Sequence, residues 1–129
     1  MAIGVWEPES PSNLSLVKMR SVLSAVADVD MTQLISNLDE SFVQANSHLM
    51  KLDKSSWAEA VNLESQEIET LVRFFTLAEM QLPGWDGGKQ NPVIYLVKIL
   101  KTRGEFPVEL KKWVKANTDN RYLPNGSAL

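Results

Sequence analysis

The stretch NPVIYLVKILKTRG, residues 91–104, decides the fold class of this chain. Residues 93–100 hold seven apolar side chains among eight, and a run this short fits a buried helix and a buried strand equally well. The flanking residues favour a helix, because Asn91-Pro92 suits a helix start and Gly104 suits a helix end. No second segment has the pattern of a convincing strand partner. We therefore predict a helix over residues 92–103 and an all-α fold.

The segment before this stretch, residues 65–82, has the apolar pattern of a long helix. Ser65 is its predicted N-cap. Phe74 and Leu77 widen the apolar face, which indicates burial against more than one neighbour. Pro83-Gly84 is the predicted end of this helix, because proline cannot continue it.

Two irregular segments and a last helix complete this part of the chain. Residues 83–91, PGWDGGKQN, have the composition of a loop. A short turn then leads to a last helix, which we predict from Pro107 to Ala116. Residues 117–129 are predicted to form an irregular tail that packs on the bundle through Tyr122 and Leu123.

The most regular apolar pattern lies in residues 31–52, where apolar side chains alternate at spacings of four and three. These residues are Met31, Ile35, Leu38, Phe42, Ala45, Leu49 and Leu52. A period of 3.5 residues packs at a shallow angle against a long partner helix. We predict one helix over 31–52 whose partners lie within the same chain. A coiled coil between two chains is the alternative, with Ile35, Leu38, Phe42 and Leu49 as candidate interface residues.

Two further helices are predicted nearer the start of the chain. The first covers residues 12–27, with Ser12 or Asn13 as its N-cap. The second is a short helix that begins at Ser55 or Ser56, since Ser56 and Glu59 have the spacing of a capping box. The whole fold is thus expected to be a single-domain irregular bundle of about five to six helices.

The domain boundaries follow from the same pattern. Residues 1–11 contain Pro8 and Pro11, which disfavour helix, so we predict an extended N-terminal arm. Residues 12–116 form the predicted bundle domain, and 117–129 the tail.

Composition excludes several classes of function. The chain has 129 residues, no Cys and one His. Without Cys there is no disulfide framework, Fe–S cluster, thiolate zinc site or cysteine nucleophile, and one His rules out a multi-histidine metal site. The first residues lack the basic and apolar regions of a signal peptide, and no window approaches 18 uncharged apolar residues. We expect a soluble cytoplasmic protein with no metal, no cofactor and no membrane span.

Charge is distributed unevenly along the chain. Residues 1–82 carry five basic and twelve acidic side chains, a net charge of −7, whereas residues 83–129 carry eight basic and four acidic ones, a net of +4. Either the two parts attract each other and are otherwise solvated, or the basic part binds an anionic partner. The candidate anion-binding or partner-binding residues are Lys89, Lys98, Lys101, Arg103, Lys111, Lys112, Lys115 and Arg121.

Three patterns that could carry catalysis are weak. Gly88-Lys89 follows Gly84 at a spacing one residue too short for a phosphate-binding loop, and Gln90 replaces the hydroxyl that would contact magnesium. An anion bound by the loop amides at the next helix is the weaker option that remains. His48 lacks a motif that supplies a nucleophile or an orienting carboxylate, so we expect a surface or interface histidine. The carboxylates form no recognisable acid–base or metal motif, and we predict no catalytic residues.

The last two helices have the outline of a helix-turn-helix, and the final one places Lys111, Lys112 and Lys115 on one face. A solvated amphipathic helix has the same pattern. The leading hypothesis is therefore a small non-catalytic protein-interaction or regulatory module, with a protein partner or a homodimer. A nucleic-acid-binding protein that uses the basic C-terminal helices is the alternative, and an enzyme ranks third.

Overall fold

A computed structural model of the chain describes residues 15–27, 40–52 and 54–124. Within these ranges the protein is an all-α bundle without a strand, which confirms the predicted fold class. The α-helices are α1 (Leu16–Ala25), α2 (Glu40–Asn46), α3 (Ser65–Gln81), α4 (Pro92–Arg103) and α5 (Val108–Ala116). The 3₁₀ segments are η1 (Ser47–Lys51), η2 (Lys54–Asn62) and η3 (Gly88–Gln90). The predicted arm, residues 1–11, lies outside the described residues.

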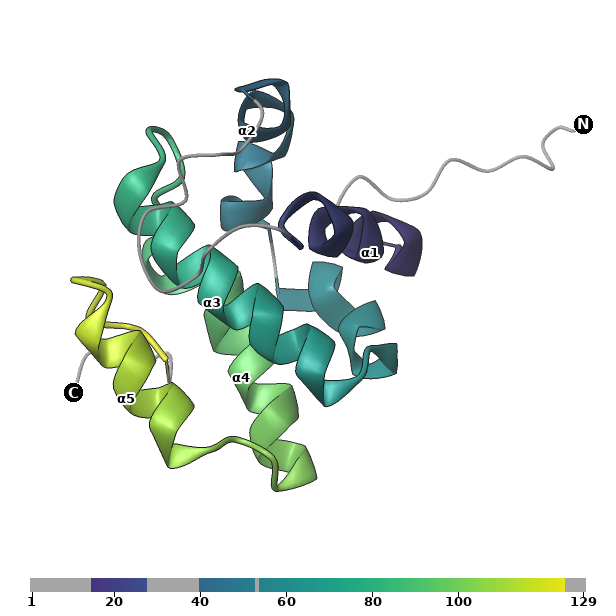
Figure 1. Ribbon diagram of the computed structural model, residues 1–129, viewed down its shortest axis with the longest axis vertical. Helices are drawn as coiled ribbons and strands as arrows, with labels where there is room; N and C mark the ends of the chain where they lie inside the picture. Colours follow the sequence, from purple (N-terminus) through teal and green to yellow (C-terminus); the bar gives the residue numbers. More distant parts are fainter. Residues whose placement is uncertain (1–14, 28–39, 53, 125–129) are drawn as a thin grey trace, which may run out of the picture.

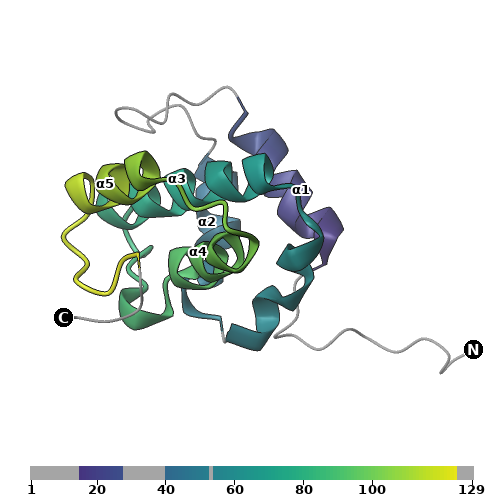
Figure 2. The ribbon, with the colours of Figure 1, turned by 90° about the horizontal axis from the view of Figure 1, so that it is seen from below.

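Helix α3 is the centre of the bundle (Figure 1). Helices α1 and α5 lie on opposite sides of it, and Figure 2 shows α4 in the middle of the molecule, between α3 and η2. Eight of the 17 residues of α3 are buried: Ile68, Leu71, Val72, Phe74, Phe75, Thr76, Leu77 and Ala78. The broad apolar face that the sequence predicts is thus used against neighbours on several sides.

Helix α4 has the boundaries that the sequence predicts. Asn91 is its N-cap and its side chain accepts a hydrogen bond of 2.8 Å from the backbone N–H of Val93. Pro92 occupies the first turn, where a missing N–H costs nothing. Gly104 ends the helix with φ of 70°, a left-handed conformation that glycine adopts without strain.

The starts of α1 and α3 differ from the prediction. Helix α1 begins at Leu16, with Ser15 as its N-cap, rather than near residue 12. Helix α3 is capped by Glu64, and Ser65 is its first helical residue. The Glu64 carboxylate accepts from the backbone N–H of Glu67, while the Glu67 side chain accepts from Glu64 N at 2.9 Å. A glutamate with a glutamate three residues later therefore replaces the serine cap.

The short helix at residues 54–62 is the 3₁₀ segment η2, and it begins earlier than predicted. Ser56 is buried inside it and its hydroxyl has no hydrogen-bond partner among the described residues. The predicted capping box of Ser56 and Glu59 is wrong, because Ser56 does not lie at the helix start.

The predicted helix over 31–52 is described only from residue 40 onward, and there it is not uniform. Helix α2 ends at Asn46 and the 3₁₀ segment η1 follows it. Leu49 is 1% exposed, and Phe42 is half-buried with its ring edge-on to Phe74 at 6.2 Å between centroids. This part of the apolar seam packs within the chain, whereas Ile35 and Leu38 lie outside the described residues.

Contacting aromatic rings run through the core. Phe74 contacts Phe75 at 5.2 Å and Trp85 at 5.7 Å, and Phe75 contacts Trp57 at 5.6 Å. Trp85 is fully buried and its indole N–H donates to the carbonyl of Val43 at 3.1 Å. The loop after α3 therefore fixes α2 to the core.

Candidate functional site

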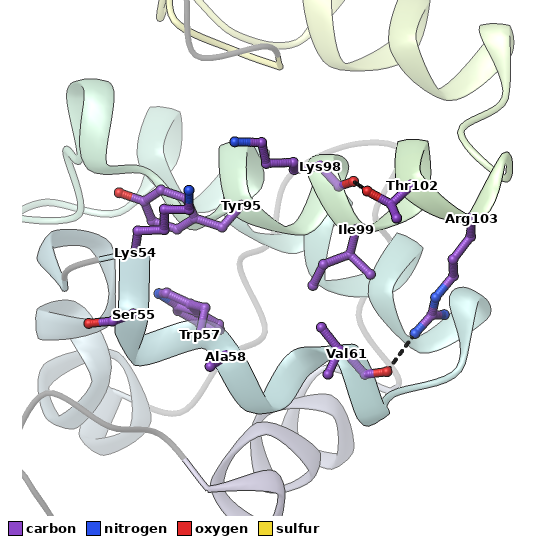
Figure 3. A pocket seen from close by; sticks show the side chains of 10 residues that line it. All are labelled: Lys54, Ser55, Trp57, Ala58, Val61, Tyr95, Lys98, Ile99, Thr102 and Arg103. Atoms are coloured by element: carbon purple, nitrogen blue, oxygen red, sulfur yellow. Dashed lines mark hydrogen bonds between the residues drawn. The ribbon is translucent and has the colours of Figure 1, made fainter.

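A groove with a volume of about 520 Å³ lies between η2 and α4 (Figure 3). Ten residues line it: Lys54, Ser55, Trp57, Ala58 and Val61 from η2, and Tyr95, Lys98, Ile99, Thr102 and Arg103 from α4. The residues from α4 follow the spacing i, i+3, i+4, i+7 and i+8, which places them along one side of that helix. The opposite side, with Leu96, Val97 and Leu100, is buried in the core.

The floor and walls of the groove are apolar. Trp57 is 2% exposed and is held by edge-on contact with Phe75, at an interplanar angle of 82°. Ile99 and Val61 extend toward each other from opposite walls (Figure 3). Val61 is 57% exposed although it is a β-branched aliphatic residue. The groove thus presents apolar surface, above all at Val61, that the described residues leave uncovered.

Hydrogen-bond donors prevail in the groove. Lys54, Lys98 and Arg103 bring three positive charges to its lining, and the lining includes no carboxylate among the described residues. The buried indole N–H of Trp57 has no hydrogen-bond partner in the described part of the chain. Its nitrogen lies on the side of Lys54 and Ser55 (Figure 3). The arrangement suits an occupant with apolar groups and acceptor oxygens.

Arg103 joins the two walls at one end of the groove. Its guanidinium donates to the carbonyl oxygens of Val61 and Leu63, at 2.9 Å and 2.8 Å. It also donates to the Ser65 hydroxyl at 2.9 Å, and that hydroxyl donates to the carboxylate of Glu105. Acceptors within the chain therefore hold the guanidinium of Arg103, whereas its role in binding an external anion stays a prediction.

A second polar cluster is centred on Glu79, near the end of α3. Its Oε2 accepts from the backbone N–H groups of Gly87 and Gly88 at 2.8 Å and 3.0 Å. Its Oε1 accepts from the side-chain amide of Asn91 at 3.0 Å. The Asn120 amide donates to Oε1 at 2.9 Å, to Oε2 at 3.1 Å and to the Gly88 carbonyl at 2.8 Å. One carboxylate therefore joins α3, the glycine loop, the start of α4 and the tail.

This cluster determines whether the amides of the glycine loop can bind an anion. The amides of Gly87 and Gly88 would have to face a bound anion, but they donate to Glu79. The first free turn of α4 is also occupied, since Asn91 accepts from Val93. The anion site expected at these amides is therefore wrong: the protein's own carboxylate takes that place.

The remaining basic candidates lie on separate elements. Lys111, Lys112 and Lys115 are exposed along α5, Lys89 is exposed on η3, and Arg121 is exposed in the tail. The Lys101 ammonium lies 5.8 Å from the centroid of the Phe106 ring. Of the eight predicted basic residues, Lys98 and Arg103 line the groove.

Trp113 is half-buried and packs against the core, and the guanidinium of Arg73 lies 5.7 Å from its ring centroid. His48 is exposed on η1. The described residues contain no group of three or more His, Asp or Glu side chains placed to hold a metal ion.

One carboxyl group has a shifted pKa. The backbone N–H of Glu64 and the guanidinium of Arg20, which both contact the Glu67 carboxylate, hold the pKa of Glu67 below its ordinary value. The Arg20 Nε atom lies 3.2 Å from Oε2 of Glu67. This pair joins α1 to α3.

The sequence predicts two of the ten lining residues, Lys98 and Arg103, as binding residues, and it does not predict the other eight. A signal for them exists on α4, where Tyr95, Ile99 and Thr102 form a second line of residues outside the core face.

No helix in the described ranges has both the length and the apolar character to cross a membrane. No protein-family model matches the chain, and neither does any curated protein or solved structure.

Proposed function

We propose that this protein is a small, non-catalytic, cytoplasmic interaction module that binds its partner in the groove between η2 and α4. The observation that carries the proposal is the uncovered apolar lining of this groove beneath two exposed lysines. Concave apolar sites with a few directed polar groups are where proteins bind ligands and peptide segments. Exposed apolar area of this kind is otherwise disfavoured, because it remains in contact with water.

The test compares two double variants in affinity purification from native extract with quantitative mass spectrometry. Ala58→Glu/Val61→Glu places two carboxylates in the groove at exposed positions, so folding stability should change by no more than about 0.5 kcal/mol per site. The matched control, Val17→Glu/Val108→Glu, makes the same type of change at residues that are 79% and 61% exposed on α1 and α5.

We expect the groove variant to lose the co-purified proteins that the wild type and the control variant both retain. Circular dichroism melting curves should be alike for all three proteins. Retention of the same proteins by the groove variant would contradict a role for the groove.

A second candidate function, nucleic-acid binding, rests on a different observation. Lys111, Lys112 and Lys115 are exposed along α5, and none forms an ion pair within the described ranges. A face that no described carboxylate pairs with supports binding of a polyanion.

Salt dependence tests this second candidate. If α5 contacts phosphates, the logarithm of the binding constant for duplex DNA should fall with the logarithm of salt concentration, by roughly −0.9 per phosphate neutralised. Replacement of the three lysines by Gln should flatten this slope. Absence of binding at low salt would leave the groove as the site of function.

A further inference from the structure

We propose that the partner segment in the groove is an acidic amphipathic peptide, with apolar side chains against Trp57 and Ile99 and carboxylates near Lys54 and Lys98. The inference rests on the proposed function, because it specifies the chemistry of the partner at that same groove. Three properties of the groove support it: its open shape, its surplus of donors and its unmatched charge.

The shape requires an occupant with two different faces. The groove is open to solvent, because several of its lining residues, Ala58, Val61 and Lys98 among them, are exposed. An occupant that fills it must therefore bury one side against apolar residues and leave the other in water. A wholly apolar chain would leave half of its surface exposed, which is unfavourable. An amphipathic peptide satisfies both requirements.

The length of the walls also suits a peptide. The lining runs from Lys54 to Val61 on η2 and from Tyr95 to Arg103 on α4, about 14 Å and about 12 Å at the rise of a 3₁₀-helix and of an α-helix. An extended segment of about four residues, or two to three turns of a helix, spans such a length. Both forms place alternate or periodic side chains on one face.

The charge of the lining selects the polar part of the partner. Lys54 and Lys98 are exposed, and neither forms an ion pair with a described carboxylate. Arg103 forms no direct ion pair with a described carboxylate, because its acceptors are two carbonyls and a hydroxyl. A basic peptide would be repelled by these three groups, and a neutral one would leave their charge uncompensated as it displaces water. Asp or Glu side chains supply both the charge and the acceptors that the groove lacks.

The experiment is a selection from a displayed library of random twelve-residue peptides on the full chain. It is run in parallel on the wild type and on Lys54→Glu/Lys98→Glu. The control variant is Lys111→Glu/Lys112→Glu, which makes the same change of net charge on α5. Peptides that also bind the Ala58→Glu/Val61→Glu variant are discarded, so that only peptides that bind in the groove are counted.

We expect groove-dependent peptides from the wild type and from the α5 control to combine apolar residues with Asp or Glu. Peptides from the Lys54→Glu/Lys98→Glu variant should be enriched in Lys and Arg instead. A synthetic peptide of the wild-type consensus should bind that variant at least tenfold more weakly by isothermal titration calorimetry, a difference that shrinks at high salt.

Other results separate the inference from the proposed function. Groove-dependent peptides without a preference for acidic residues would overturn the inference and leave the proposed function intact. Failure to obtain any groove-dependent peptide would overturn the inference, and loss of partners in the extract experiment would still report on the function. Binding of dodecanoate in the groove, with no peptide selected, would replace the peptide by an anionic amphiphile and overturn the proposal.

Discussion

The Glu79 cluster and the groove between η2 and α4 are opposites in how they use polar groups. At Glu79 a carboxylate accepts from two backbone amides and two side-chain amides, so donors and acceptors within the chain are matched. In the groove two lysines and one indole N–H lack a matching acceptor among the described residues. The first region resembles a ligand site in its sequence, with three glycines and a lysine in one loop, and the second has no motif at all.

The contrast shows that a dense polar sequence motif is a weaker indication of a binding site than polar groups that lack partners in the folded chain. A loop rich in glycine and asparagine can be required by the fold alone, when one carboxylate organises it. A stripe of ordinary residues becomes a candidate site when folding leaves its donors and its apolar area uncovered.

The largest effect is expected at Glu79. Replacement by Gln keeps the size of the side chain but turns one acceptor oxygen into an NH₂ group. In either orientation that group faces other N–H donors, either the Gly87 and Gly88 amides or Asn91. We expect Glu79→Gln to lower the free energy of unfolding by about 3 kcal/mol in urea titrations, because four donors, most of them part-buried, lose a charged acceptor that they share.

The exposed Asp86 in the same loop provides the control for this change. Asp86→Asn should change the free energy of unfolding by less than about 0.5 kcal/mol. Equal stability of the Glu79 and Asp86 variants would mean that the cluster does not organise the fold.

A smaller loss is expected at Gly87. A Cβ atom on this residue would lie 2.7 Å from the carbonyl oxygen of Met50, which is a backbone atom that cannot move by itself. We expect Gly87→Ala to destabilise the protein by about 2 kcal/mol, the range for overpacking in a core. The melting temperature should fall accordingly, whereas Lys89→Ala nearby should leave it unchanged. A wild-type melting temperature for Gly87→Ala would show that the loop is not fixed against η1.

The pair of Arg20 and Glu67 tests a second carboxylate whose hydrogen-bond partners lie within the chain. The pKa of Glu67 is lowered in the folded protein, so its contribution to stability is present at neutral pH and is lost as the pH falls below its ordinary value of 4.5. Arg20→Ala should lower the free energy of unfolding by about 0.5 kcal/mol at pH 7, because the pair is half-exposed. Urea titrations should show that this difference disappears in acid; a difference that persists there would assign the loss to packing.

The smallest effect on stability is expected in the groove. Lys54→Gln and Lys98→Gln together should change the free energy of unfolding by less than about 0.5 kcal/mol, since neither lysine has a partner among the described residues that folding requires. The same double variant should weaken partner binding. A marked loss of stability would place these lysines with Glu79, as groups that serve the fold.

The parts of the fold that local signals specify were predictable from the sequence. Helix α4 was predicted with its correct ends, because Asn91, Pro92 and Gly104 act on their immediate neighbours. The change from α2 to η1 was not, since the apolar seam continues through it while Asn46 is buried there. A regular spacing of apolar residues indicates burial but does not fix which hydrogen-bonding pattern the backbone adopts.

The two polar regions depend on contacts that no local pattern shows. Glu79 meets its partners 8, 9, 12 and 41 residues away in the chain. Arg103 donates to the carbonyls of Val61 and Leu63 across 40 residues or more of sequence, a contact that its own neighbours in the sequence do not indicate. The groove likewise exists only because η2 lies beside α4.

The position of Arg103 also determines how the groove can move. Because its guanidinium holds two carbonyls at the end of η2 and a hydroxyl at the start of α3, the walls cannot separate there without breaking three hydrogen bonds. Any widening must therefore be a rotation about this end, with the largest displacement near Lys54 and Tyr95 (Figure 3). A hinge fixed at one end limits the conformations of the empty groove. A partner then loses less conformational entropy on binding than it would between two walls that move freely.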